Sequence, residues 1–75
     1  MNKRQRKQLR ELCDQAEEIK NEVEMIRDEE QEKIDNLPDS LQGSMKEDEY
    51  QEGIDALEEI ISAFDDVFDK FSELI

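Results

Sequence analysis

The residues best suited to chemistry are five basic side chains within the first ten positions, where no acid occurs: Lys3, Arg4, Arg6, Lys7 and Arg10. Arginine and lysine are the side chains that proteins use to hold phosphate groups. Lys3, Lys7 and Arg10 would lie on successive turns of a helix, so one side of that helix would be strongly positive. The cluster is therefore a candidate site for the phosphate groups of a nucleotide or another phosphorylated small molecule, above all where several copies converge in an oligomer.

A second interpretation of this basic head, residues 1–10, is that it forms ion pairs within the protein. An antiparallel hairpin would bring three acids of the C-terminal part near the head: Asp66, Asp69 and Glu73. No aromatic residue is interleaved with the bases, as a binding platform for single-stranded nucleic acid would require. The sequence leaves both a ligand site and an ion-pair network open.

Acidic residues match two metal-binding patterns in part. The segment from Asp48 to Glu59 has the central glycine and final glutamate of a calcium loop, but Tyr50 stands where the loop needs an oxygen ligand. The string Asp65-Asp66-Val67-Phe68-Asp69 has the D-D-x-x-D form of a magnesium–pyrophosphate motif, which acts only inside a large helical cavity. Both segments also fit a helical repeat, so we expect solvated helix faces with no bound metal or cofactor.

An enzyme is not expected. The chain has no histidine, so Ser-His-Asp and Cys-His arrangements are excluded. Its one cysteine, Cys13, adjoins an apolar stripe and is interpreted as a small packing residue and not as a nucleophile. Glu17, Glu18 and Glu22 could begin an acidic magnesium site, but acids are so frequent here that such groups arise without selection.

The chain is short and strongly acidic. It has 75 residues with 23 acids and 10 bases, a formal net charge of −13, and 35% hydrophobic residues. So short a chain without an internal disulfide seldom buries enough apolar surface to fold alone, and we expect a homo-oligomer or a complex. No apolar run reaches the roughly 20 residues of a membrane span, and no signal peptide is recognisable, which favours the cytoplasm.

Apolar spacing predicts a first helix over residues 3–35. Six residues recur at steps of three and four, the spacing of a helix–helix contact: Leu9, Leu12, Ala16, Ile19, Val23 and Ile26. The pattern fails at Glu30 and Lys33 and resumes one residue late at Ile34, which indicates a stutter or the approach of the helix end.

A turn over residues 36–44 follows, because this is the only stretch rich in helix breakers. Pro38 cannot continue the first helix, but it can open a short helical turn that Gly43 closes in a left-handed conformation. Ser44 and Glu47 have the S-x-x-E spacing of a capping box, which predicts a second helix over residues 45–75.

The second helix carries an apolar stripe wider than one partner helix can cover. Its surplus predicts self-association through Ile54, Leu57, Ile60, Ile61, Phe64, Val67, Phe68, Phe71, Leu74 and Ile75. Gly53 lies in the row of Ile60 and Val67, where a missing side chain would admit another helix closely. We therefore expect an all-α fold, a single domain of residues 1–75. It would be an antiparallel two-helix hairpin that assembles into a homo-oligomeric helical bundle.

The segment Ile26-Arg27-Asp28-Glu29-Glu30-Gln31-Glu32-Lys33-Ile34-Asp35-Asn36-Leu37-Pro38-Asp39-Ser40-Leu41-Gln42 resembles uncharacterised small proteins of phages and prophages of Gram-positive bacteria. In those proteins an I-R-D-E-E-Q-E run leads into a D-N-L-P turn, and an acidic helix like Ala56-Leu57-Glu58-Glu59-Ile60 follows. With the basic start of the chain, the likeness covers most of its length. It implies a genomic setting, the infected bacterial cell, and no particular chemistry.

The function expected from these features is binding. The first hypothesis is inhibition or sequestration of a host component, including one of antiviral defence, either through the acidic surface or through the basic head. Alternatives are a sponge for a phosphorylated nucleotide signal, a nucleic-acid decoy that occupies a basic cleft, and a structural or adaptor protein of the phage particle. The net charge of −13 opposes binding to duplex nucleic acid.

Overall fold

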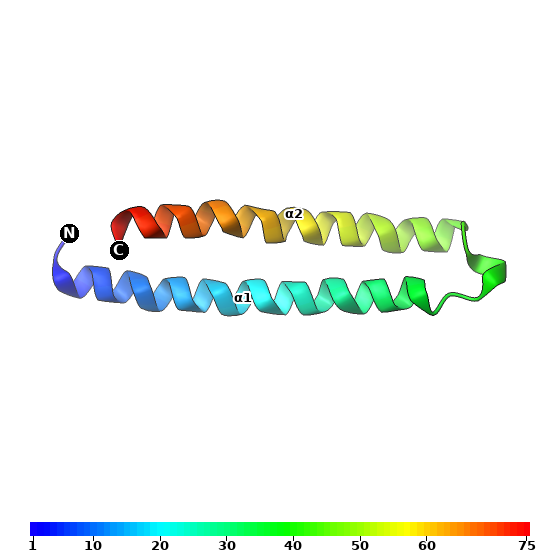
Figure 1. Ribbon diagram of the computed structural model, residues 1–75, viewed down its shortest axis with the longest axis horizontal. Coiled ribbons are helices and arrows are strands. Elements are labelled where there is room, and N and C mark those ends of the chain that lie inside the picture. Colours follow the sequence, from blue (N-terminus) through cyan, green and yellow to red (C-terminus); the bar gives the residue numbers. More distant parts are fainter.

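A computed structural model describes residues 1–75 as two long antiparallel helices joined by a compact turn (Figure 1). Helix α1 spans Lys3–Asp35 and helix α2 spans Met45–Leu74. The hairpin measures 60 × 15 × 11 Å, and both termini lie at the end opposite the turn (Figure 1). The predicted all-α hairpin is confirmed, and the helix bounds agree with those expected from the sequence.

Helix α1 begins with a capping box that the sequence analysis missed. Asn2 Oδ1 accepts a hydrogen bond from the backbone N–H of Gln5 at 2.8 Å, and the Gln5 side chain accepts one from the N–H of Asn2 at 3.0 Å. This reciprocal pair satisfies two of the N–H groups that a helix start leaves without partners. Glutamine replaces the more familiar glutamate at the third position, which is why the motif is easily overlooked.

The turn between the helices has the predicted construction. A 3-10 turn, Asp39–Leu41, starts directly after Pro38, and Gly43 adopts the left-handed conformation with φ of +77°. Pro38 is the N-cap residue of this turn: its ring fixes φ, its missing N–H is not needed there, and its carbonyl oxygen accepts a hydrogen bond from the Leu41 N–H at 2.8 Å. The glycine lets the chain reverse through a left-handed conformation that residues with a Cβ atom rarely adopt.

The predicted capping box of α2 is wrong in its details. Ser44 is the N-cap residue as expected, but its side chain caps no backbone group, and its buried Oγ has no hydrogen-bond partner. Glu47 reaches past Ser44 and accepts a hydrogen bond from the backbone N–H of Gly43. The carboxylate therefore ties the start of α2 to the turn and not to the N-cap residue.

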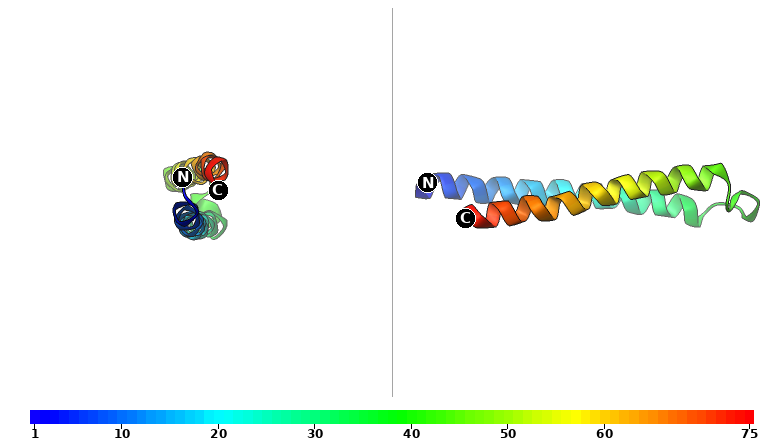
Figure 2. Two further views of the ribbon diagram at one scale, coloured as in Figure 1. Left: turned by 90° about the vertical axis from the view of Figure 1, so that its left-hand side faces the viewer. Right: turned by 90° about the horizontal axis from the view of Figure 1, so that it is seen from above.

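The row of α1 that contacts α2 differs from the expected one. Apart from Glu24, the half-buried residues of α1 recur at regular steps of four and three along the helix: Leu9, Cys13, Ala16, Lys20, Val23, Arg27, Glu30 and Ile34. Leu12, Ile19 and Ile26 lie beside this contact row and stay exposed. No stutter occurs after Ile26, because the repeat continues through charged residues. Figure 2 shows the two helices winding gently about each other, as such a repeat requires.

The apolar stripe of α2 divides into two rows with different surroundings. One row faces α1 and contains six of the ten residues predicted to mediate self-association: Ile54, Leu57, Ile61, Phe64, Phe68 and Phe71. Within it, the rings of Phe64 and Phe68 lie 5.9 Å apart, and Lys20 Nζ lies 5.8 Å from the Phe68 ring. The other four residues stay exposed: Ile60, Val67, Leu74 and Ile75.

The core of the hairpin is thin. Ile54, at 3% exposure, is the only residue that is fully buried. Neither helix has an apolar stretch long enough to cross a membrane. One hydrophobic contact line of this kind rarely supplies more than about 3–5 kcal/mol of stability in so short a chain.

Gly53 offers a direct test of how closely the helices pack. A Cβ atom at this position would meet only Glu30 Oε2 at 3.8 Å, which is an ordinary contact, so α1 does not need the missing side chain. Gly53→Ala is therefore expected to stabilise the hairpin by about 1 kcal/mol through helix propensity. Thermal unfolding followed by circular dichroism should show a melting temperature about 4–8 °C higher.

The matched control for this variant is Gly43→Ala. Gly43 has open space around it but a positive φ, so alanine there is expected to lower the melting temperature. A melting temperature for Gly53→Ala below that of the wild type would contradict the prediction.

Candidate functional site

The basic head lies at the end of the hairpin where the two termini meet. Leu9 lines an open depression with Phe71 and Leu74, so it lies beside the last turns of α2. The start of α1 extends beyond the end of α2 (Figure 1). All five bases of the head are exposed.

None of the five bases of the head forms an ion pair. The ion pairs of the chain join Lys20 to Glu24 and Asp65, and also join Arg27–Asp28, Lys33–Glu30 and Lys70–Glu73. Glu73, which was a predicted partner of the head, is held by Lys70 at 3.7 Å, and Asp66 and Asp69 have no basic partner. The interpretation of the head as an ion-pair network within the hairpin is therefore not supported.

Basic side chains at the start of α1 are electrostatically unfavourable. The unpaired N–H groups of a helix N-terminus carry a partial positive charge, which favours acids there and disfavours bases. The first turn of α1 contains no acid, and Lys3, Arg4 and Arg6 occupy it or adjoin it. A bound anion would be stabilised both by these side chains and by the helix dipole, and it would relieve their mutual repulsion.

The geometry of the head suits a compact anion. Lys3, Lys7 and Arg10 follow one another at steps of four and three, so they share one side of α1. Arg6 is four residues from Arg10 and can reach the same region. Guanidinium groups bind phosphate oxygens through two parallel hydrogen bonds, and ammonium groups add point charges. The surface is convex, so it can bind an anion by charge but cannot enclose it.

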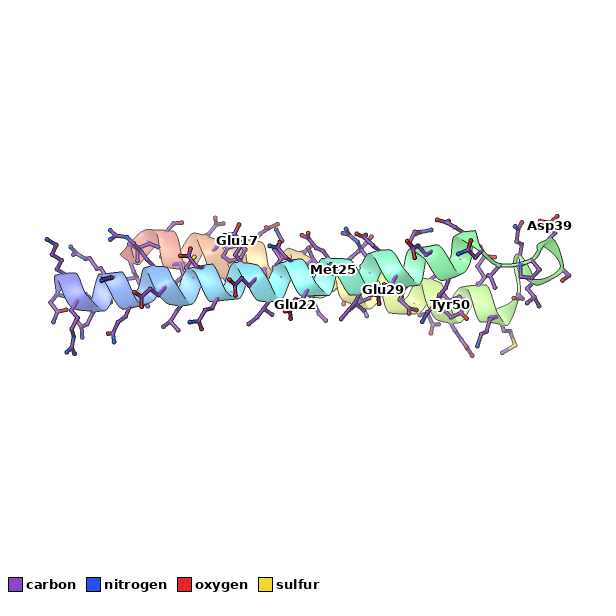
Figure 3. The ribbon with its side chains drawn as sticks, turned by 90° about the horizontal axis from the view of Figure 1, so that it is seen from below. Glu17, Glu22, Met25, Glu29, Asp39 and Tyr50 are labelled. Carbon is purple, nitrogen blue, oxygen red and sulfur yellow. The ribbon has the colours of Figure 1, made fainter.

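The other candidate motifs, those for metal binding and the single cysteine, do not form sites. Asp48 to Glu59 lies inside the continuous helix α2, so the segment does not have the loop conformation that the calcium motif needs. The D-D-x-x-D string is likewise helical, and its three aspartates are exposed. Figure 3 shows Glu17 on one edge of α1 and Glu22 on the other, with Met25 between the edges, so these two carboxylates do not converge. Cys13 is half-buried in the contact row with α2.

A cluster at the turn end of the hairpin was not predicted. Lys33 Nζ donates a hydrogen bond to Glu30 Oε1 at 2.5 Å, which raises the pKa of the Lys33 ammonium above its usual value. Lys33 and Lys46 place their Nζ atoms 5.6 Å and 5.4 Å from the ring of Tyr50. The pairs Glu30–Lys33 and Lys46–Tyr50 have helical spacings of three and four, which is the signal that could have revealed them. The cluster joins α1 to α2 beside the turn.

Comparison with known proteins gives no relative: no family model matches the chain, and no curated protein or solved structure shows significant similarity to it. The resemblance to phage proteins stays a prediction from the residues that carry it. The chemistry of the chain is accordingly inferred from its charges and its geometry.

Proposed function

We propose that this chain is a small accessory protein of phage type that acts by binding, in the cytoplasm of a bacterial host, and that it sequesters a host component with phosphate groups. The observation that carries the proposal is the basic head: its five side chains lie together, exposed and without acidic partners, in a chain that has acids in large excess. Basic side chains that form no ion pair within so acidic a chain favour an anionic partner.

The charge distribution favours a small phosphorylated molecule over a nucleic acid. The net charge of −13 repels an extended polyanion that must run along the acidic body. A compact ligand at the end of the hairpin feels mainly the nearby bases, because salt at 0.1 M screens charges beyond about 10 Å. The head is therefore proposed to hold a phosphorylated compound such as a nucleotide signal.

Self-association is the second part of the proposal. We infer that copies of the hairpin assemble into a helical bundle, and the thin core supports this inference because a single fully buried residue leaves the lone hairpin marginally stable. Ile60, Val67 and Leu74 supply exposed apolar surface for the assembly. Phe68, by contrast, packs on Phe64 inside the hairpin, so its replacement would test folding and not assembly.

The binding proposal predicts that the ligand is lost when the head is neutralised. Protein purified from Gram-positive host cells is denatured, and the small molecules it releases are identified by mass spectrometry. The wild type is expected to release a phosphorylated compound in stoichiometric amount. The variant Lys3→Ala/Arg4→Ala/Arg6→Ala/Lys7→Ala is expected to release less than about a tenth as much, since removing one charged group that binds the anion lowers the affinity roughly tenfold.

A control variant neutralises acids in place of bases: Glu58→Gln, Glu59→Gln, Asp65→Asn and Asp66→Asn. It should release as much ligand as the wild type, and circular dichroism should show both variants to be folded. Recovery of no phosphorylated compound from the wild type, or undiminished recovery from the base variant, would contradict the proposal.

A second candidate function is the capture of a basic host protein by the acidic surface. The observation in its favour is a set of acids that recurs every seven residues on an exposed side of α2: Glu52, Glu59, Asp66 and Glu73. The same pair of variants separates the candidates. If the acidic surface binds the host protein, the acid variant no longer captures it and the base variant still does.

A further inference from the structure

An apolar row lies exposed along each helix of the hairpin. On α1 the row consists of Leu12, Ile19 and Ile26, which are 50%, 52% and 48% exposed. On α2 it consists of Ile60, Val67 and Leu74, which are 47%, 40% and 50% exposed. In each row the members are seven residues apart, so they follow one side of the helix through four turns. Isolated exposed apolar residues are common, but two regular rows are not.

The two rows lie on the same side of the hairpin. Leu9, in the contact row between the helices, lines two open depressions. One of these depressions includes Leu12, and the other includes Val67 and Leu74. The rows of α1 and α2 therefore flank the contact line from the same side, and together they form one elongated face.

This face is almost free of charge in an otherwise highly charged chain. The positions four residues before the α1 row are Gln8, Gln15 and Glu22, and those four residues before the α2 row are Ala56, Ala63 and Lys70. Such positions adjoin the apolar rows on the helix surface. Only Glu22 and Lys70 are charged among these twelve positions, although 44% of the whole chain is charged. Glu29 and Glu30, three and four residues after Ile26, border the face at the end near the turn. We call the twelve positions the uncharged face.

The hairpin exposes more surface than a compact protein of its mass, so it has area that a second copy could cover. The hairpin exposes 5854 Å². A compact monomeric protein of the same 8.9 kDa mass exposes about 4,800 Å². The excess of roughly 1,000 Å² is slightly more than the about 800 Å² that each partner contributes to a stable interface.

We propose that the uncharged face is covered by the uncharged face of a second copy, so that two hairpins form a four-helix bundle. This inference rests on the proposed self-association and names the surface that carries it. A second copy fits because a twofold interface needs a self-complementary surface, and both rows repeat every seven residues with side chains of similar size. A charged surface of another protein would find almost no partner charges here.

The proposed interface leaves the basic head accessible. Lys3 and Arg10 belong to the same seven-residue row as Glu17, which lies on the edge of α1 opposite Glu22 (Figure 3). Glu22 adjoins the uncharged face, so these two bases point away from it. Pairing of the hairpins therefore does not compete with binding of an anion at the head.

The first test measures the oligomeric state by sedimentation equilibrium of the wild type, Ile19→Glu and Met25→Glu. Met25 is the matched control because it is 63% exposed but lies on the outer side of α1, between its two edges (Figure 3). Ile19→Glu is expected to raise the dimer dissociation constant by at least about 100-fold, since two charges would be buried at each interface. Met25→Glu is expected to leave it within about threefold of the wild type.

The second test uses a substitution at an exposed residue that is expected to strengthen the dimer, so a loss of folding cannot imitate the expected result. Glu22→Leu extends the apolar row at the edge of the face and is expected to tighten the dimer by about tenfold. Glu18→Leu is the control, because Glu18 is exposed away from the face, and it should have no such effect.

The outcomes test self-association and the position of the interface separately. A wild type that is folded and monomeric at all concentrations would overturn the self-association itself. A dimeric wild type in which Ile19→Glu and Glu22→Leu behave like their controls would overturn the uncharged face as the interface and leave the self-association standing.

Discussion

Replacement of Ile54 with aspartate is expected to abolish the helical circular dichroism of the chain at micromolar concentration. Ile54 is the only fully buried residue, and it lies in the row by which α2 contacts α1. Truncation of a buried isoleucine to alanine costs about 2–5 kcal/mol, and a buried carboxylate without a partner costs more. A hairpin whose total stability is of that order would unfold.

The control for Ile54→Asp is Met25→Asp, which puts the same side chain at a highly exposed apolar position of α1. Urea titrations followed by circular dichroism compare the two variants with the wild type. The midpoint for Met25→Asp should stay near that of the wild type, while Ile54→Asp should show no folded baseline. A cooperative transition for Ile54→Asp at the wild-type midpoint would mean that the helices do not depend on the burial of Ile54.

The helices and the turn could be predicted because their signals are local. Pro38 and Gly43 act through their own backbone conformations, so the 3-10 turn follows from the residues that compose it. The capping of α2 was less predictable, since the Glu47 carboxylate can reach the backbone N–H of either Ser44 or Gly43. The choice between these two donors depends on the path of the turn.

The contact row of α1 could not be read from its apolar residues. Leu12, Ile19 and Ile26 have the spacing of a contact row, but they lie one row away from it. The true row places Lys20, Arg27 and Glu30 against α2. Long charged side chains can cover apolar surface with their stems while their charged ends reach water, which makes a charged residue compatible with either row. A row of three large aliphatic residues on α1 consequently stays uncovered.

The candidate site was predictable in its composition and not in its environment. Five bases without an acid in the first ten residues are evident from the sequence. Whether acids of α2 neutralise them depends on the register of the two helices, which sets Leu9 and not Lys3 beside the last turns of α2. This register depends on the length of the segment that joins the helices. A segment longer or shorter by a few residues would change which α2 acids lie near the head, including Asp66 and Asp69.

The triple variant Lys20→Leu/Arg27→Leu/Glu30→Leu completes the apolar contact row of α1. It is expected to raise the free energy of unfolding by about 3 kcal/mol. The side chains of these residues are 24%, 31% and 22% exposed, so each leucine would be mostly buried. Full burial of a leucine contributes about 1.5–3 kcal/mol. Removal of the Lys20–Phe68 interaction and of partly exposed ion pairs offsets part of that gain in free energy of unfolding. The melting temperature should rise by more than about 10 °C.

The control carries the same number of leucines on the outward side of α1, at Glu11, Glu18 and Glu32. These residues are exposed, so their replacement should change the free energy of unfolding by about 0.5 kcal/mol or less per site. Equal melting temperatures for the two triple variants would show that the row containing Lys20 and Arg27 is not the one that α2 covers. If the contact-row variant alone is stabilised, the row containing Lys20 and Arg27 is the one that α2 covers, and its charged residues are what keep the natural hairpin marginally stable.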